Sequence, residues 1–244
     1  NVPNKIGNNL MVKVKDAASG STVAGVSSVF KIKGGLVINA PTALTEWEVK
    51  SAHNILWTPV GTYTGKSVRI DYSPDGTTWT EIATTAAGAH GVQQSYPWTP
   101  AGTDIGTGRY IKITTLFGDA DIDVSTTLSG FKLSGAVNIT YPDAANIIWN
   151  VGTAYSITWT ATGLVTPVKI EYTTDGSAWT ELTSTHVGVD GSNSYPWTVP
   201  ATLNSETCQI RVSDARTGFS AVTDTSTNVF SIRPVITVSA PVSG

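Results

Sequence analysis

An internal repeat, marked by its tryptophans, limits the folds open to this 244-residue chain more than any other feature. The eight tryptophans form two sets of four, offset by 102, 102, 100 and 99 residues: Trp47 and Trp149, Trp57 and Trp159, Trp79 and Trp179, and Trp98 and Trp197. The surrounding sequences are also similar, as residues 70–82 and residues 170–182 show. Two copies of a unit of about 100 residues predict two domains of the same fold in tandem.

Both ends of the chain carry parts of the same repeat. Two segments near the N-terminus match the end of the second full copy: residues 11–16 match residues 209–214, and residues 29–32 match residues 229–232. Near the C-terminus, residues 235–241 resemble the starts of the two full copies. The predicted organisation is residues 1–34 as closing strands of a preceding repeat, 35–135 and 136–234 as full domains, and 235–244 as the first strand of a following repeat.

The partial repeats at the two ends are too short to close a core of their own, since they hold 34 and 10 residues. Open strand edges and bare apolar faces invite pairing with other strands. The expected partners are therefore neighbouring repeats of the same polypeptide, or identical subunits of a filament or lattice that complete the sheet by strand complementation. The N-terminal residues have no initiator Met and no apolar signal core, which indicates a mature or internal segment.

Alternating apolar and polar residues predict β-strands in both copies. In residues 67–72, Val68, Ile70 and Tyr72 alternate with Arg69 and Asp71. The second copy repeats this pattern, with Lys169 and Glu171 as its charged residues. Period-two alternation places the apolar set in a core and the charged set in water.

Turn residues separate the strands at short intervals. Asp75-Gly76 and Asp175-Gly176 supply tight turns, because glycine accepts a positive φ. Each copy has about seven short strands and no convincing helix, which predicts an all-β chain of tandem immunoglobulin-like β-sandwich domains.

An ordered set of short segments resembles a known family. The segments are Trp149-Asn-Val-Gly152, Ile157-Thr-Trp-Thr160, Val168-Lys-Ile-Glu-Tyr172, Asp175-Gly176 and Ser194-Tyr-Pro-Trp-Thr-Val-Pro200. Together they resemble the Kre9/Knh1-related immunoglobulin-like domain of fungal cell-wall proteins and of bacterial surface and secreted proteins. The first copy departs from this pattern in its loops, with Trp47-Glu-Val-Lys50 and an early Pro100. The resemblance implies a modular extracellular protein, and it carries no catalytic residues to this chain.

Composition excludes several kinds of partner. Only 14% of the residues are charged, against about 25% in a typical domain, and Thr, Ser and Gly replace them. Such a surface is typical of extracellular β proteins, so we expect an extracellular or cell-surface location. A net charge of −3 gives no footprint for nucleic acid or for an anionic membrane. No apolar run approaches the roughly 20 residues that span a bilayer, so no membrane insertion is expected.

Residues able to perform chemistry show no catalytic pattern. His53, His90 and His186 are expected to be solvated residues, two of them in loops before the Ser-Tyr-Pro-Trp strands. The single Cys208 can form neither an intrachain disulfide nor a cysteine metal site. No phosphate-binding glycine loop, His-Glu-x-x-His motif or nucleophile elbow is present. We therefore predict no enzyme activity and no organic cofactor.

One acidic cluster is a candidate metal site. Asp119, Asp121 and Asp123 alternate along the chain, and in an extended segment they would share a face. Clustered carboxylate oxygens suit Ca²⁺. The alternative is a solvated acidic loop, and the matching stretch of the second copy, residues 214–224, has fewer and more widely spaced acids.

Two classes of function remain open. One is a non-catalytic structural or assembly segment of a repetitive surface protein, such as a spacer, a filament, a surface layer or an adhesin stalk. The other is a module that binds carbohydrate or a host surface, for which exposed tryptophans would form stacking platforms. Core packing of the tryptophans is favoured because they recur at fixed places, and Trp57, Trp79, Trp159 and Trp179 lie within strand patterns. The structural class is favoured because no loop concentrates polar and aromatic residues.

Overall fold

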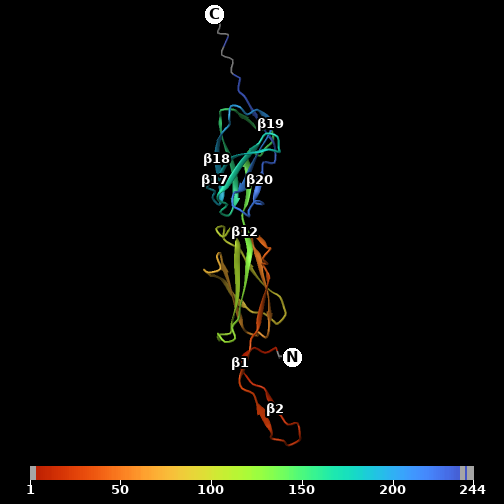
Figure 1. Cartoon of the computed structure of the whole chain (residues 1–244). Helices are drawn as coiled ribbons and strands as arrows, with labels where there is room; N and C mark the ends of the chain where they lie inside the picture. Colours follow the sequence, from red (N-terminus) through yellow and green to blue (C-terminus); the bar gives the residue numbers. More distant parts are fainter. Residues whose placement is uncertain (1–3, 237–239, 241–244) are drawn as a thin grey trace. The chain divides into compact units, whose positions relative to one another are not determined.

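The computed structural model describes residues 4–236 and residue 240, and its described part consists of β-strands joined by turns and loops (Figure 1). No helix that could cross a membrane occurs among these residues. The chain divides into two compact units. The first comprises Asn1–Trp47, Ala52–Thr99 and Gly106–Lys132, and the second comprises Glu48–Ser51, Pro100–Ile105 and Leu133–Gly244.

The first sandwich contains two sheets. The smaller has the strand order β10 (Gln94–Trp98), β7 (His53–Val60), β5 (Gly35–Ala40). The larger has the order β6 (Glu46–Glu48), β12 (Ser125–Ser134), β11 (Gly106–Leu116), β8 (Ser67–Ser73), β9 (Thr80–Ala86). Neighbouring strands in the smaller sheet are antiparallel, as are β11, β8 and β9 in the larger one.

The second sandwich repeats this arrangement. Its smaller sheet has the order β13 (Ala136–Tyr141), β15 (Ala154–Thr162), β18 (Gly191–Thr198). Its larger sheet has the order β14 (Ile148–Asn150), β21 (Phe230–Arg233), β19 (Ser205–Asp214), β16 (Val168–Thr173), β17 (Trp179–His186), and β20 (Thr223–Thr225) also pairs with β19. Two sheets per copy, with eight strands in the first sandwich and nine in the second, confirm the predicted all-β, immunoglobulin-like fold.

Residues before the first sandwich form a narrow ribbon, defined here as residues 7–32. It consists of β1 (Gly7–Leu10) paired with β4 (Phe30–Ile32), and β2 (Lys13–Lys15) paired with β3 (Ala24–Val26). The domain limits 35–135 and 136–234 stay predictions. Most of the predicted opening strand at 235–244 lies outside the described residues, because residues 237–239 and 241–244 are not among them.

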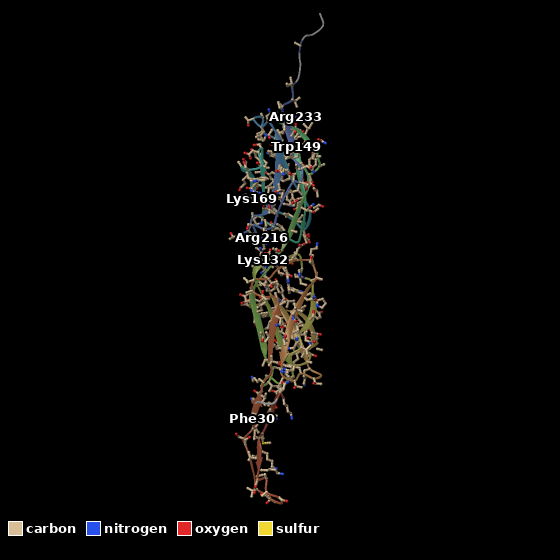
Figure 2. All side chains as sticks on the ribbon, turned by 90° about the vertical axis from the view of Figure 1, so that its right-hand side faces the viewer. Phe30, Lys132, Trp149, Lys169, Arg216 and Arg233 are labelled. Atoms are coloured by element: carbon tan, nitrogen blue, oxygen red, sulfur yellow. The ribbon has the colours of Figure 1, made fainter. Side chains whose placement is uncertain are left out.

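Large aromatic side chains fill the core of each sandwich. Trp57 on β7 and Trp159 on β15 are each 1% exposed, which confirms that both are core residues. Trp149 is fully buried within the second sandwich (Figure 2). The Tyr155 ring stacks on Trp149 with 4.7 Å between centroids, and His53 stacks on Trp47 at 4.8 Å in the same way. Equivalent residues of the two sandwiches therefore form the same stacked ring pair.

Aspartate side chains hold the hairpin turns between β8 and β9 and between β16 and β17. In the second, Asp175 Oδ1 accepts hydrogen bonds from the backbone N–H groups of Ser177 at 2.8 Å and Ala178 at 2.9 Å. Asp75 accepts the equivalent two bonds in the first turn, both at 2.8 Å. Gly176 follows with φ of 77°, in the region that favours glycine. The Asp-Gly pair therefore forms the turn that the sequence predicts.

Both turn aspartates are expected to stay ionised in acid. The backbone N–H groups of Ser177 and Ala178, then the Thr173 hydroxyl, lower the pKa of Asp175 to about 2. Because this value lies below that of the unfolded chain, about 4, the stabilisation is complete above pH 4 and is lost as the pH falls through about 2. Titration of the Asp175 carboxyl carbon by NMR should give a midpoint near 2. A midpoint near 4 would show that the turn bonds do not form in solution.

Candidate functional site

Charged residues on the outer face of the larger sheets form a cluster that both sandwiches repeat at equivalent positions. In the first sandwich this cluster centres on Asp71 of β8, which is 3% exposed. Arg69 Nε lies 3.1 Å from its carboxylate, and Lys112 Nζ from β11 lies 3.8 Å from it. The expectation that Asp71 stands in water is therefore wrong. Its side chain is short, and the longer cationic chains close over it and exclude water.

Glu171 of β16 occupies the equivalent place in the second sandwich and is 5% exposed, so its expected exposure is also wrong. Lys169 Nζ, labelled in Figure 2, lies 2.6 Å from Glu171 Oε1. Arg211 of β19 donates from Nε at 2.8 Å and approaches with Nη2 at 2.7 Å, both to Oε2. Burial raises the pKa of Glu171, but hydrogen bonds and charge from Lys169 and Arg211 outweigh it, and the net pKa is lowered.

Two tryptophans complete these clusters. Lys112 Nζ lies 3.8 Å from the ring centroid of Trp79, and the Arg211 guanidinium lies 4.1 Å from that of Trp179. Both indoles are half-buried on the outer face, so the prediction that they pack in the core is wrong. Trp79 immediately precedes the edge strand β9, and Trp179 is the first residue of the edge strand β17. A cation lying over an aromatic face stabilises both groups.

The carboxylates of these clusters are already paired with cations of the same cluster. Each carboxylate is matched by two cations, so it offers neither a free acid nor a free base for catalysis. A hollow of about 280 Å³ lies beside Glu171 and is also lined by Asp214 and Ser213. The Asp214 carboxylate is in turn bound to Arg216. Among residues 4–236 and 240, no group of three or more His, Cys, Asp or Glu side chains is placed to hold a metal ion.

Asp119, Asp121 and Asp123 lie in the turn between β11 and β12. The segment is not extended, since Asp123 N donates to Asp119 O at 2.9 Å, so alternation does not place the carboxylates on one face. Asp119 accepts from Asn8 Nδ2, Asp121 pairs with Lys31 Nζ at 2.6 Å, and Asp123 Oδ1 accepts from Phe117 N at 2.6 Å. Each carboxylate therefore has a different protein partner. A Ca²⁺ site here stays a prediction, and this geometry lends it no support.

All three histidines were expected to be solvated, but two of them lie on strands and pack against tryptophans. His53 lies on β7 against Trp47, and His186 is the last residue of β17, where its ring meets Trp159 edge-on at 5.3 Å. Burial lowers the pKa of His186, which favours its neutral form. His90 is exposed and its Nδ1 accepts from Gly61 N at 3.0 Å. These histidines therefore pack or close turns and are not brought together.

Sequence reasoning missed the cations that cover the buried carboxylates. Lys112 and Arg211 occupy matching places in residues 110–113 and 209–212, which alternate in the same way. The sequence signal for these ion pairs was that both matching positions hold a positively charged residue, while the strand beside each holds a negatively charged one. Strand register was needed to use it, because Lys112 pairs with Asp71 and Arg211 with Glu171 across the sheet.

Comparison with known proteins found similar solved structures but no matching family. No family model matches the chain, and no curated protein matches it. Among solved structures it is similar to fibronectin(III)-like modules of Clostridium thermocellum CbhA, with 14% identity and a TM-score of 0.27 over 83% of this chain and 94% of that one. It is also similar to the titin Ig tandem A164-A165, with 12% identity and a TM-score of 0.34 over 84% and 100%.

A third similar structure is the D1–D4 ectodomain fragment of ICAM-5, with 12% identity and a TM-score of 0.41 over 96% of this chain and 64% of that one. At such scores these similarities carry no argument about function. The immunoglobulin-like assignment rests on the strand order and pairing described above.

Proposed function

We propose that this chain is a non-catalytic structural segment of a repetitive extracellular or cell-surface protein. Its sandwiches would serve as building units of a spacer, filament, surface layer or adhesin stalk. The resemblance to the Kre9/Knh1-related domain and the hydroxyl-rich surface support the extracellular assignment. Neither observation names a ligand.

One observation carries the proposal. Both sandwiches repeat the same outer-face cluster, in which a buried carboxylate is held by two cations and one cation covers a tryptophan. The carboxylate is paired with two cations inside each cluster, so the pairing holds neighbouring strands together and leaves the carboxylate unavailable to a substrate. A repeated cluster that ties neighbouring strands together suits a building unit.

Carbohydrate binding is the second candidate. The half-exposed indoles of Trp79 and Trp179 favour it, since they stand at equivalent surface positions and could stack on sugar rings. Lys112 and Arg211 lie over these rings, however, and occupy faces that a sugar would need. The structural role is therefore the better-supported proposal.

A glycan array decides between the two candidates. The structural role predicts no saturable binding by the intact chain, and the same array signal for a Trp79→Ala, Trp179→Ala double variant. Saturable binding that the double variant loses, while its denaturation profile keeps two folded sandwiches, would replace the structural proposal with the carbohydrate-binding one. Trp57→Phe, a substitution in the buried core, is the matched control and should leave any array signal unchanged.

A further inference from the structure

The ribbon of residues 7–32 has the strand pairing of the closing strands in the second sandwich. Its pairs are Gly7 with Ile32, Leu10 with Phe30, Lys13 with Val26 and Lys15 with Ala24. The second sandwich pairs Ser205 with Ile232, Cys208 with Phe230, Arg211 with Thr225 and Ser213 with Thr223. Each residue in these ribbon pairs precedes its counterpart in the second sandwich by 198 to 200 positions in the sequence. Both registers also shift at the same point, between the first two pairs.

A shared set of hydrogen bonds fixes this equivalence at the centre of the ribbon. Val12 N donates to Ser27 Oγ at 2.9 Å, and Ser27 N donates to Val12 O at 2.9 Å. In the second sandwich, Ile210 N donates to Ser226 Oγ at 3.2 Å, and Ser226 N donates to Ile210 O at 2.9 Å. The ribbon therefore has the same strand pairing and the same central hydrogen bonds as the closing strands of a sandwich.

The apolar face of the ribbon is bare where its counterpart is a core. The exposed residues are Val12 at 53%, Val14 at 68%, Val23 at 70% and Phe30 at 38% (Phe30 is labelled in Figure 2). Their counterparts Ile210, Val212, Val222 and Phe230 are all buried. Apolar side chains at the positions that close the second sandwich thus face solvent in the ribbon, and burying them would be favourable.

One backbone edge of the ribbon is also open. In the second sandwich, β16 pairs with β19 through six residues, from Gln209 to Asp214. The matching ribbon residues, 11–16, have no strand on that side in the part of the chain that the structure describes. An open edge beside a bare apolar face is a template for strand addition.

We propose that the ribbon closes a third sandwich, and that its apolar face is covered by the opening strands of a repeat of the same kind. The occupant is a polypeptide segment equivalent to residues 136–198, whose β16-like strand would pair with residues 11–16 and whose other strands would cover Val12, Val14 and Phe30. A second copy of the present chain is not that occupant. In a second copy the strands of residues 136–198 are already paired with each other and with β19 and β21.

A fusion chain tests this inference, which deepens the proposed structural role by naming the ribbon's partner. Residues 136–198 are joined ahead of Asn1, so that the whole chain follows a segment with the required strands. Hydrogen exchange is then measured in the fused and the original chain. Amides of residues 11–16 should exchange at least about 100-fold more slowly in the fused chain, because an isolated two-stranded ribbon is marginal.

Matched variants separate docking from general stability. In the fused chain, Val14→Asp should abolish the added protection, since it places a charge in the new core. Lys13→Gln, on the opposite face of the same strand, should preserve it. In the original chain, Val14→Asp should leave exchange in both sandwiches unchanged, because Val14 is exposed there.

Two results would overturn the inference. One is a fused chain whose residues 11–16 exchange as fast as in the original chain. The other is an original chain that already protects these residues through concentration-dependent self-association, which would make a second copy the occupant. Neither result involves a ligand, so glycan binding found on the array would overturn the proposed function and leave this inference standing.

Discussion

Trp159→Ala should lower the free energy of unfolding of the second sandwich by about 3–5 kcal/mol. The indole is 1% exposed on β15, the central strand of its sheet, so the substitution removes buried apolar surface and leaves a cavity. The chain holds two sandwiches, and a single two-state fit is therefore unsuitable. Denaturant-dependent hydrogen exchange of amides in β15 and β18 measures the loss directly.

Trp179→Ala is the matched control for that substitution. The same residue type is removed, but from the half-buried outer face, where it contacts Arg211. We expect a loss of about 1 kcal/mol, in the range of a cation–π contact with partial burial. Equal losses for the two variants would contradict the assignment of Trp159 to the core and of Trp179 to the surface.

Arg211→Met should destabilise the second sandwich by about 3 kcal/mol. Arg211 supplies both contacts to Glu171 Oε2, so its removal leaves that oxygen buried without its partner while Lys169 still holds Oε1. Removing one partner of a buried ion pair costs more than replacing both partners by apolar residues, because the remaining charge keeps only part of its compensation. Urea unfolding of the single variant, followed through amides of β16 and β19, gives the value.

The double variant Glu171→Leu, Arg211→Met tests the cause of that loss. It removes the buried charge together with its partner, so it should be more stable than Arg211→Met alone. If the double variant loses as much as the sum of its single variants, Glu171 is not held as a buried ion pair. Since the pKa of Glu171 is lowered on folding, the stabilisation that its carboxylate provides should be lost as the pH falls through that lowered pKa.

Most of the fold could be predicted because it depends on local patterns that occur twice. The alternation of Val68, Ile70 and Tyr72 places them inside, and all three are buried. The paired tryptophans Trp57 and Trp159 identify equivalent core positions for the same reason. Repetition adds information here, since a pattern retained at an offset of 102 residues reflects a shared environment.

The outer-face clusters could not be predicted, because they depend on register between strands. Alternation alone places Asp71 on the solvent side of β8, and it does lie on that face. Whether it is solvated depends on Lys112, 41 positions later, which β11 brings alongside it. The expectation that the acidic residues share one face of an extended segment was wrong for a related reason. Alternation groups Asp119 and Asp121 only in an extended strand, and here the chain turns.

Stretching single molecules by their two ends tests the central claim, that the chain consists of two separately folded sandwiches suited to a structural role. Two unfolding steps of similar size are predicted, each releasing about 350 Å of extended chain less the folded length, from about 100 residues at roughly 3.5 Å each. The ribbon should add no third step. A single step releasing about twice that length would contradict the account, because the two copies would then unfold as one body.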